Sequence, residues 1–169
     1  EKENREVAEI FSDTCFDLLH TIRMSTFVTL SNMSEFLDLA DFSDKIILPL
    51  LDSLLHWAVC PSAYAKDVNP PDNLSFQLLA FETLVKLSMK VANIDLILAT
   101  PPFSRIEELF KILVRCIGKE EEQVLRELSI VILSNFASAD ILSARIILHL
   151  DYSIFNLLTF IEQYEFTRR

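Results

Sequence analysis

A short helical sequence pattern occurs three times in this chain, and it constrains the fold more than any single residue does. The copies are Thr29-Leu30-Ser31-Asn32-Met33, Thr83-Leu84-Val85-Lys86-Leu87 and Ile132-Leu133-Ser134-Asn135-Phe136. Their first residues are 54 positions apart (29 to 83) and then 49 positions apart (83 to 132), a little more than the roughly 40 to 47 residues of armadillo and HEAT units. Each copy precedes a short apolar segment, a break and a longer amphipathic segment. This order predicts stacked helical repeats, in which each unit buries its apolar face against a neighbour.

A low glycine content narrows the fold further, because tight turns depend on this residue. The 169 residues include one glycine, Gly118, against roughly 12 at an average usage of about 7%. Hairpin turns, phosphate-binding loops and dinucleotide-binding turns need backbone conformations or close approaches that glycine permits. The sequence therefore predicts an all-α protein, in which Gly118 ends a helix.

The repeats are expected to form one domain over residues 1–169, an armadillo-like α-α superhelix of about three repeats. A chain of this size buries on the order of 70% of the surface that its unfolded form exposes. Residues 61–73 are predicted to be an inserted polar loop, which accounts for the longer first interval. The mean hydropathy of +0.32 is high for a free monomer, so we expect a fragment of a longer solenoid with an uncovered apolar end.

Apolar residues spaced near 3.6 and a few breaking residues predict the helix boundaries. Pro61 is expected to stop one helix and the pair Pro101-Pro102 another. Ser104 and Glu107 have the spacing of an N-terminal capping box, so a helix is expected to begin just after Ser104. The predicted helices cover residues 5–22, 26–39, 44–60, 74–90, 94–99, a segment from the capping box to about residue 117, and then 121–138, 140–149 and 152–165.

Charge and cysteine content limit the possible partners and compartment. The net charge of −10 would repel the phosphates that a nucleic-acid-binding protein must neutralise. Cys15, Cys60 and Cys116 are odd in number and widely spaced, which favours reduced thiols in the cytosol or nucleus. No uncharged run reaches the ~18 residues of a membrane span. We expect a soluble protein with no direct nucleic-acid binding through this segment and no membrane association.

Signals for catalysis or metal binding are weak. His56 and Cys60 lie one helical turn apart and provide half of a zinc site, but no further ligands follow nearby, so a core or interface role is preferred. Asp13 and Asp17 share a helix face, where solvated surface is the preferred interpretation over acid and base catalysis. The chain has no HExxH, GxSxG or Walker motif. The sequence thus predicts no enzyme, no cofactor, no metal and no small-molecule ligand.

Two sequence blocks are not explained by helical periodicity. They are Leu54-Leu55-His56-Trp57-Ala58-Val59-Cys60-Pro61-Ser62 and Asp95-Leu96-Ile97-Leu98-Ala99-Thr100-Pro101-Pro102-Phe103-Ser104-Arg105. Both resemble, nearly residue for residue, the C-terminal helical region of the Osa-type AT-rich-interaction-domain subunit of SWI/SNF (BAF) chromatin remodellers. The similarity runs from about Lys45 to Leu158.

The resemblance implies an armadillo-like core-binding region that docks this subunit onto the rest of a nuclear remodeller and supports transcription regulation. The implied partners are other core subunits, including helical segments of the ATPase and of the scaffold subunits. We expect Trp57, Pro101, Pro102, Phe103 and Arg105 to form the exposed contact set, since Trp, Phe and Arg dominate many binding hot spots. The alternative for the set is intramolecular packing, with Arg105 simply in the first turn of its helix.

A second hypothesis is an elongin-type ubiquitin-ligase adaptor. Thr83-Leu84, Ser88 and Ala92 follow the spacing of an elongin-binding box, in which Ser88 replaces the usual Cys. The helical periodicity, however, places Leu84 on the core-facing side. The scaffold function is therefore the preferred hypothesis.

Overall fold

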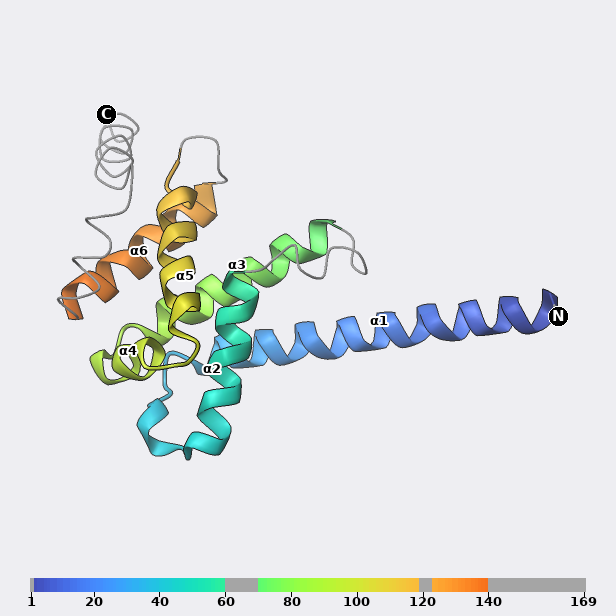
Figure 1. Cartoon of the computed structure of the whole chain (residues 1–169), viewed down its shortest axis with the longest axis horizontal. Helices are drawn as coiled ribbons and strands as arrows, with labels where there is room; N and C mark the ends of the chain where they lie inside the picture. Colours follow the sequence, from blue (N-terminus) through green and yellow to red (C-terminus); the bar gives the residue numbers. More distant parts are fainter. Residues whose placement is uncertain (1, 60–69, 119–122, 140–169) are drawn as a thin grey trace.

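All the secondary-structure elements in the described part of the chain are helices (Figure 1). The computed structural model describes residues 2–59, 70–118 and 123–139, with side chains from residue 14 in the first range and from residue 76 in the second. The elements are α1 (Lys2–Met33), the 3-10 helix η1 (Leu39–Asp41), α2 (Asp44–Val59), α3 (Pro70–Leu87), α4 (Val91–Leu98), α5 (Phe103–Cys116) and α6 (Gln123–Ala139). No strand occurs in these ranges, so the all-α prediction is confirmed for them.

The helices follow one another in a repeated order. A long helix, a short helix and an amphipathic helix occur as α1-η1-α2 and again as α3-α4-α5, after which α6 is the next long helix. The long helix α3 packs between α1 and α6. The amphipathic helices α2 and α5 pack against each other, and in addition α2 packs on α3 and α5 packs on α6. The short elements η1 and α4 also lie in contact. In Figure 1 the N-terminal half of α1 extends well beyond the other helices.

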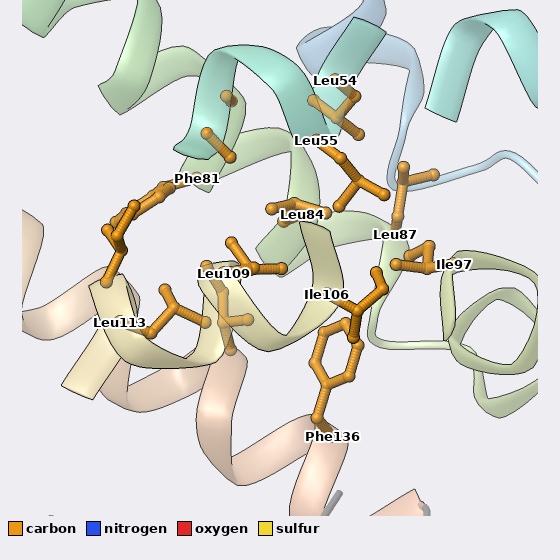
Figure 2. Packing of buried hydrophobic residues seen from close by; sticks show 14 of the residues in the cluster. Leu54, Leu55, Phe81, Leu84, Leu87, Ile97, Ile106, Leu109, Leu113 and Phe136 are labelled. Atoms are coloured by element: carbon orange, nitrogen blue, oxygen red, sulfur yellow. The ribbon is translucent and has the colours of Figure 1, made fainter. Parts of the chain in front are cut away.

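The core lies where α2, α3, α5 and α6 meet. Figure 2 shows Leu54 and Leu55 of α2, Leu84 of α3 and Leu109 of α5 converging, with Phe136 of α6 on the other side. All five side chains are buried. Burial of one such side chain stabilises the fold by roughly 1.5 to 3 kcal/mol. The three copies of the sequence pattern lie at or near the C-terminal ends of α1, α3 and α6.

The N-terminal segment forms one helix where two were predicted, over residues 5–22 and 26–39. The expected break is bridged by Arg23, Met24 and Ser25, of which Arg and Met favour helix. Nearby hydroxyls also bond to carbonyls one turn back: Thr26 Oγ1 donates to Ile22 O at 2.8 Å and Thr29 Oγ1 to Ser25 O at 2.7 Å. These bonds satisfy the hydroxyls inside the helix, so α1 continues to Met33.

Prolines lie in the first turns of two helices, one of which begins earlier than predicted and the other where predicted. The inserted loop was expected to extend to residue 73, but α3 begins at Pro70, because proline is well suited to the first turn of a helix, where its missing N–H is not needed. Residues 60–69 lie outside the described residues. Pro49 is the sixth residue of α2, which begins at Asp44. Pro49 and Lys45 are both exposed, so water can bind the Lys45 carbonyl that Pro49 leaves without an intrahelical partner.

The capping box predicted at Ser104 is wrong. The N-cap of α5 is Pro102, which has an extended backbone and makes no side-chain cap bond, so Ser104 lies within the first turn. That turn closes through Arg105 N, which donates to Pro102 O at 2.9 Å. The C-terminal end agrees with the prediction: α5 stops at Cys116, and Gly118 N donates to Arg115 O. The helices predicted over 140–149 and 152–165 lie outside the described residues.

Candidate protein interface

The turn between α4 and α5 forms a projecting apolar corner. Phe103 is 69% exposed, and Pro101 and Pro102 beside it are also exposed. Both flanks of the corner are fixed in the core. Thr100 is buried and its Oγ1 donates to Leu96 O at 2.9 Å, while Ile106 on the other flank is buried among apolar side chains. Three of the five predicted contact residues are thus brought together on one exposed turn.

Arg105 fixes this corner to the neighbouring amphipathic helix. Its Nη1 forms an ion pair with Asp52 Oδ1 of α2 and donates a second hydrogen bond, of 3.1 Å, to Asp52 O. The Arg105 side chain is only 22% exposed. Arg105 was predicted to be an exposed contact residue; instead its guanidinium is engaged within the chain and positions Phe103.

Trp57 is also not exposed, which corrects its place in the predicted contact set. It is 8% exposed. Its ring stacks on Phe76 of α3 with centroids 4.6 Å apart and meets the edge of Phe27 of α1 at 6.2 Å. Aromatic pairs of this kind favour offset or edge-to-face packing and join elements through large buried areas. Trp57 therefore joins α2 to α1 and α3 as a core residue.

A buried amide that the sequence reasoning missed holds the two short elements together. Asn93 of α4 is fully buried. Its Oδ1 accepts from Leu39 N at 2.8 Å, and its Nδ2 donates to Leu37 O and to Leu87 O, each at 3.1 Å. Asn93 thus connects the segment after α1 with the segment after α3. Its presence in a mostly apolar helix was the only sequence signal that could have found it.

Polar contacts also join successive long helices. Lys86 Nζ of α3 donates to Ser31 O of α1 at 2.9 Å and to Ser31 Oγ at 3.1 Å. Asn135 Nδ2 of α6 donates to Ser88 Oγ, just after α3, at 2.9 Å. Lys86 and Asn135 occupy the same, fourth position of the repeated pattern. The same register position therefore contacts the end of the preceding long helix twice.

Exposed apolar side chains extend beyond the predicted contact set. They include Phe36 and Met89, which follow α1 and α3, and a group on α1 itself, which the sequence reasoning did not select. Periodicity in the sequence does not distinguish an apolar face that packs within the chain from one that stays exposed. Finding these residues therefore requires a comparison of burial at equivalent positions of the repeats.

The candidate catalytic and metal-binding residues do not come together in the described structure. His56 is partly buried beside Trp57, with ring centroids 6.2 Å apart, and Cys60 lies outside the described residues. Asp17 is exposed, and nothing is described of the Asp13 side chain. Over the described residues, no three His, Cys, Asp or Glu side chains are grouped in a way that could hold a metal ion.

Two further observations concern charge and hydrophobic length. Glu107 and Lys111, four residues apart on α5, form an ion pair, with Lys111 Nζ 3.0 Å from Glu107 Oε1. The hydrogen bond and the negative charge of Glu107 raise the pKa of the Lys111 ammonium, which lies at the surface. None of the helices in the described ranges combines the length and apolar content that crossing a bilayer requires.

Apolar side chains left exposed at a rigid turn and along a helix are typical of proteins that bind other proteins. Comparison with known sequences agrees with this class. The chain belongs to the SWI/SNF-like complex subunit BAF250/Osa family, whose profile matches residues 1–168. It is 43% identical, over 178 aligned residues, to the Trithorax group protein osa of Drosophila melanogaster.

That alignment covers 97% of this chain and 7% of the Drosophila protein, so the chain corresponds to a small part of its relative. The family that the sequence resemblance suggested is thereby confirmed. The family description is that of a subunit of a complex.

Proposed function

We propose that this chain is a non-catalytic, armadillo-like scaffold that docks its subunit onto the core of a nuclear SWI/SNF (BAF) chromatin remodeller. The family match over residues 1–168 is the observation that carries this proposal. The apolar corner at Phe103, held from beneath by the ion pair of Arg105, supports a docking role. The net charge of −10 supports protein partners for this segment over direct contact with nucleic acid.

The armadillo-like arrangement is supported by helix order and by packing. Armadillo units contain two or three helices and stack side by side. Here the series of long, short and amphipathic helices is repeated, and long helices pack on long helices. The apolar positions of the two amphipathic helices also correspond. At an offset of 59 residues, each of the six buried residues of α2 matches a buried residue of α5 or its C-cap, Ile117: Ile47, Leu51, Leu54, Leu55, Trp57 and Ala58 with Ile106, Phe110, Leu113, Val114, Cys116 and Ile117.

The partners we propose are helical segments of other core subunits, including the ATPase and the scaffold subunits. A helix that docks on a surface of this kind inserts apolar anchors between the turns. Phe103 offers a large apolar side chain without the conformational cost of ordering a loop, because Thr100 and Ile106 already fix the turn. An exposed, pre-ordered aromatic residue is well suited to be a binding hot spot.

The test is replacement of Phe103 by Ala in the full-length subunit, followed by co-purification with the other remodeller subunits. We expect captured core subunits to fall at least about tenfold, which corresponds to about 1.4 kcal/mol. The melting temperature should stay unchanged, because the ring has few contacts to lose. Phe36→Ala, which removes an equally large exposed ring at a different turn, shows whether the loss of capture is specific to the Phe103 corner. Equal capture by Phe103→Ala and the unmodified protein would contradict the proposed contact.

The elongin-adaptor hypothesis is disfavoured by burial. Thr83 and Leu84 are fully buried and Ser88 is nearly so, and Ser88 Oγ accepts the amide of Asn135. A partner could reach these side chains only if α3 left the core. A pull-down with elongin B and C distinguishes the hypotheses: retention of both by the folded protein would favour the adaptor, whereas co-purification of remodeller subunits favours the scaffold.

A further inference from the structure

The outer face of α1 is open at positions that are buried in the other two long helices. With the offsets of 54 and 49 residues, Ile22 corresponds to Phe76 and Leu125, and Met33 corresponds to Leu87 and Phe136. The four residues of α3 and α6 are buried, but Ile22 is 53% and Met33 is 51% exposed. Thr29 repeats the difference, since it is exposed while its counterparts Thr83 and Ile132 are fully buried.

These open positions form one continuous stripe. Ile22, Thr26, Thr29 and Met33 are spaced by four, three and four residues, which places them on one helix face. The hydroxyls of Thr26 and Thr29 already bond to carbonyls of α1, so the stripe is apolar in character. A different face of α1 packs on α3, through His20 and Phe27 against Phe76. The helix thus has one occupied face and a second apolar face without a cover in the described structure.

The polar contacts between long helices identify a further unused position. Lys86 and Asn135, fourth in their copies of the pattern, each donate to the end of the preceding long helix. Asn32 is the equivalent residue of α1 and is exposed. Its amide is therefore placed to donate to the last turn of a helix lying against the outer face of α1.

The amphipathic layer is open on the same side. At the offset of 59 residues, Ile46 of α2 corresponds to Arg105 of α5. Arg105 contacts the preceding amphipathic helix through Asp52, whereas Ile46 is 59% exposed. Both layers therefore present uncovered side chains at the positions that contact a preceding unit elsewhere in the chain.

We infer that the outer face of α1, with Ile46 of α2, binds one more helical unit of this repeat type, carried by the same polypeptide in the longer proteins of this family. The inference rests on the proposed repeat architecture. The two existing interfaces, α1 with α3 and α3 with α6, define the geometry that this third interface continues. The Drosophila relative contains enough further polypeptide to supply such a unit, because this chain corresponds to 7% of it.

The chemistry of the face defines what the added unit must offer. Its long helix must present an apolar stripe opposite Ile22 and Met33, and its last turn must offer a carbonyl or hydroxyl oxygen to the Asn32 amide. Its amphipathic helix must offer an apolar neighbour to Ile46, because an acidic side chain such as Asp52 has no cation to meet there.

Cysteine accessibility in the full-length subunit, purified without other subunits, tests the inference. Thr29→Cys places a thiol on the proposed interface, and Val28→Cys places one on the adjacent face of the same helix. Both positions are exposed in the described structure. The counterparts of Thr29 are buried. Val28 corresponds to Glu82 and Val131, which both reach the surface. Alkylation by N-ethylmaleimide is followed by mass spectrometry, and circular dichroism verifies that both variants are folded.

We expect Thr29→Cys to react at least about tenfold more slowly than Val28→Cys, because alkylation requires the docked unit to open. Adding Ile22→Asp should restore the fast reaction at position 29, since an unpaired carboxylate in the interface disfavours docking. Equal rates at positions 28 and 29 would overturn the inference. So would protection that appears only after other subunits are added, which would indicate a partner, or protection that disappears on dilution, which would indicate a second copy.

The outcome is independent of the Phe103 experiment, because no other remodeller subunit is present. Loss of the proposed docking function would leave the protection of Thr29→Cys intact. Loss of protection would leave remodeller assembly through Phe103 open.

Discussion

Replacement of Asn93 by Ala removes a buried side chain that connects both short elements, and its cost can be worked out from the structure. Three hydrogen bonds are lost, to Leu39 N, Leu37 O and Leu87 O. Leu87 O keeps a partner, since Lys90 N donates to it at 3.3 Å. Leu39 is 1% exposed, so its N–H is left buried without an acceptor. A buried group deprived of its partner costs about 1 to 3 kcal/mol.

The substitution leaves the buried Leu39 N–H without an acceptor and removes a donor from the carbonyl of Leu37, which is only partly buried. We therefore expect Asn93→Ala to lower the free energy of unfolding by about 3 kcal/mol. For a chain of this length, a loss of about 3 kcal/mol lowers the melting temperature by roughly 6 to 12 °C. Urea denaturation followed by circular dichroism measures the first quantity, and a thermal melt measures the second.

Two further variants make the reasoning specific. Asn93→Asp keeps the acceptor for Leu39 N but faces the Leu37 and Leu87 carbonyls with an oxygen, so it should destabilise at least as much as Ala. Asn135→Ala removes a single, half-buried hydrogen bond to Ser88 and should cost only about 1 kcal/mol. A loss below about 1 kcal/mol for Asn93→Ala, or an Asp variant as stable as the original, would refute the assignment of Asn93 as the connecting residue.

Two other predictions concern the core and the surface. Trp57→Ala should lower the free energy of unfolding by about 3 to 5 kcal/mol, measured by urea denaturation; an unchanged stability combined with loss of captured subunits would return Trp57 to the contact set. The Glu107 pair raises the pKa of Lys111, so its small contribution to stability is present below the pKa of the unfolded lysine and is lost as the pH rises through the higher pKa of the folded state. Melts of the original protein and of Glu107→Gln should therefore converge at strongly alkaline pH, and a difference that grew with pH would contradict this sign.

The helices were predictable from the sequence because they depend on local patterns. Apolar spacing placed α2 from residue 44 onwards, and glycine placed the end of α5. The merging of two predicted segments into α1 was harder to anticipate, because it depends on hydroxyls that bond within the helix rather than compete with it. Ser104 failed as a cap for a related reason. The first turn of α5 is fixed by Arg105, whose partner Asp52 lies 53 residues away in sequence.

The candidate interface was predictable only in part. Pro101, Pro102 and Phe103 are exposed as expected, since two adjacent prolines make a turn that stays at the surface. Trp57, like Phe103, was selected because large aromatic residues are common in binding hot spots. Phe27 and Phe76 from two other helices cover it, however. No local pattern in the sequence distinguishes an aromatic residue that is exposed for binding, such as Phe103, from one that is buried within the chain, such as Trp57.

The chemical difference between Lys86 and Asn135 bears on how the chain avoids mispairing as it folds. Three long helices with similar apolar registers can exchange places at little hydrophobic cost, as happens when repeats are misassembled. An ammonium seated on the Ser31 carbonyl and an amide seated on the Ser88 hydroxyl are not interchangeable in length, charge or donor geometry. If α6 took the place of α3 beside α1, its shorter amide would face the oxygens that the long Lys86 side chain now reaches. Each contact between successive long helices therefore uses a different polar pair. The order of the helices is specified by these polar groups at their ends as well as by their apolar faces.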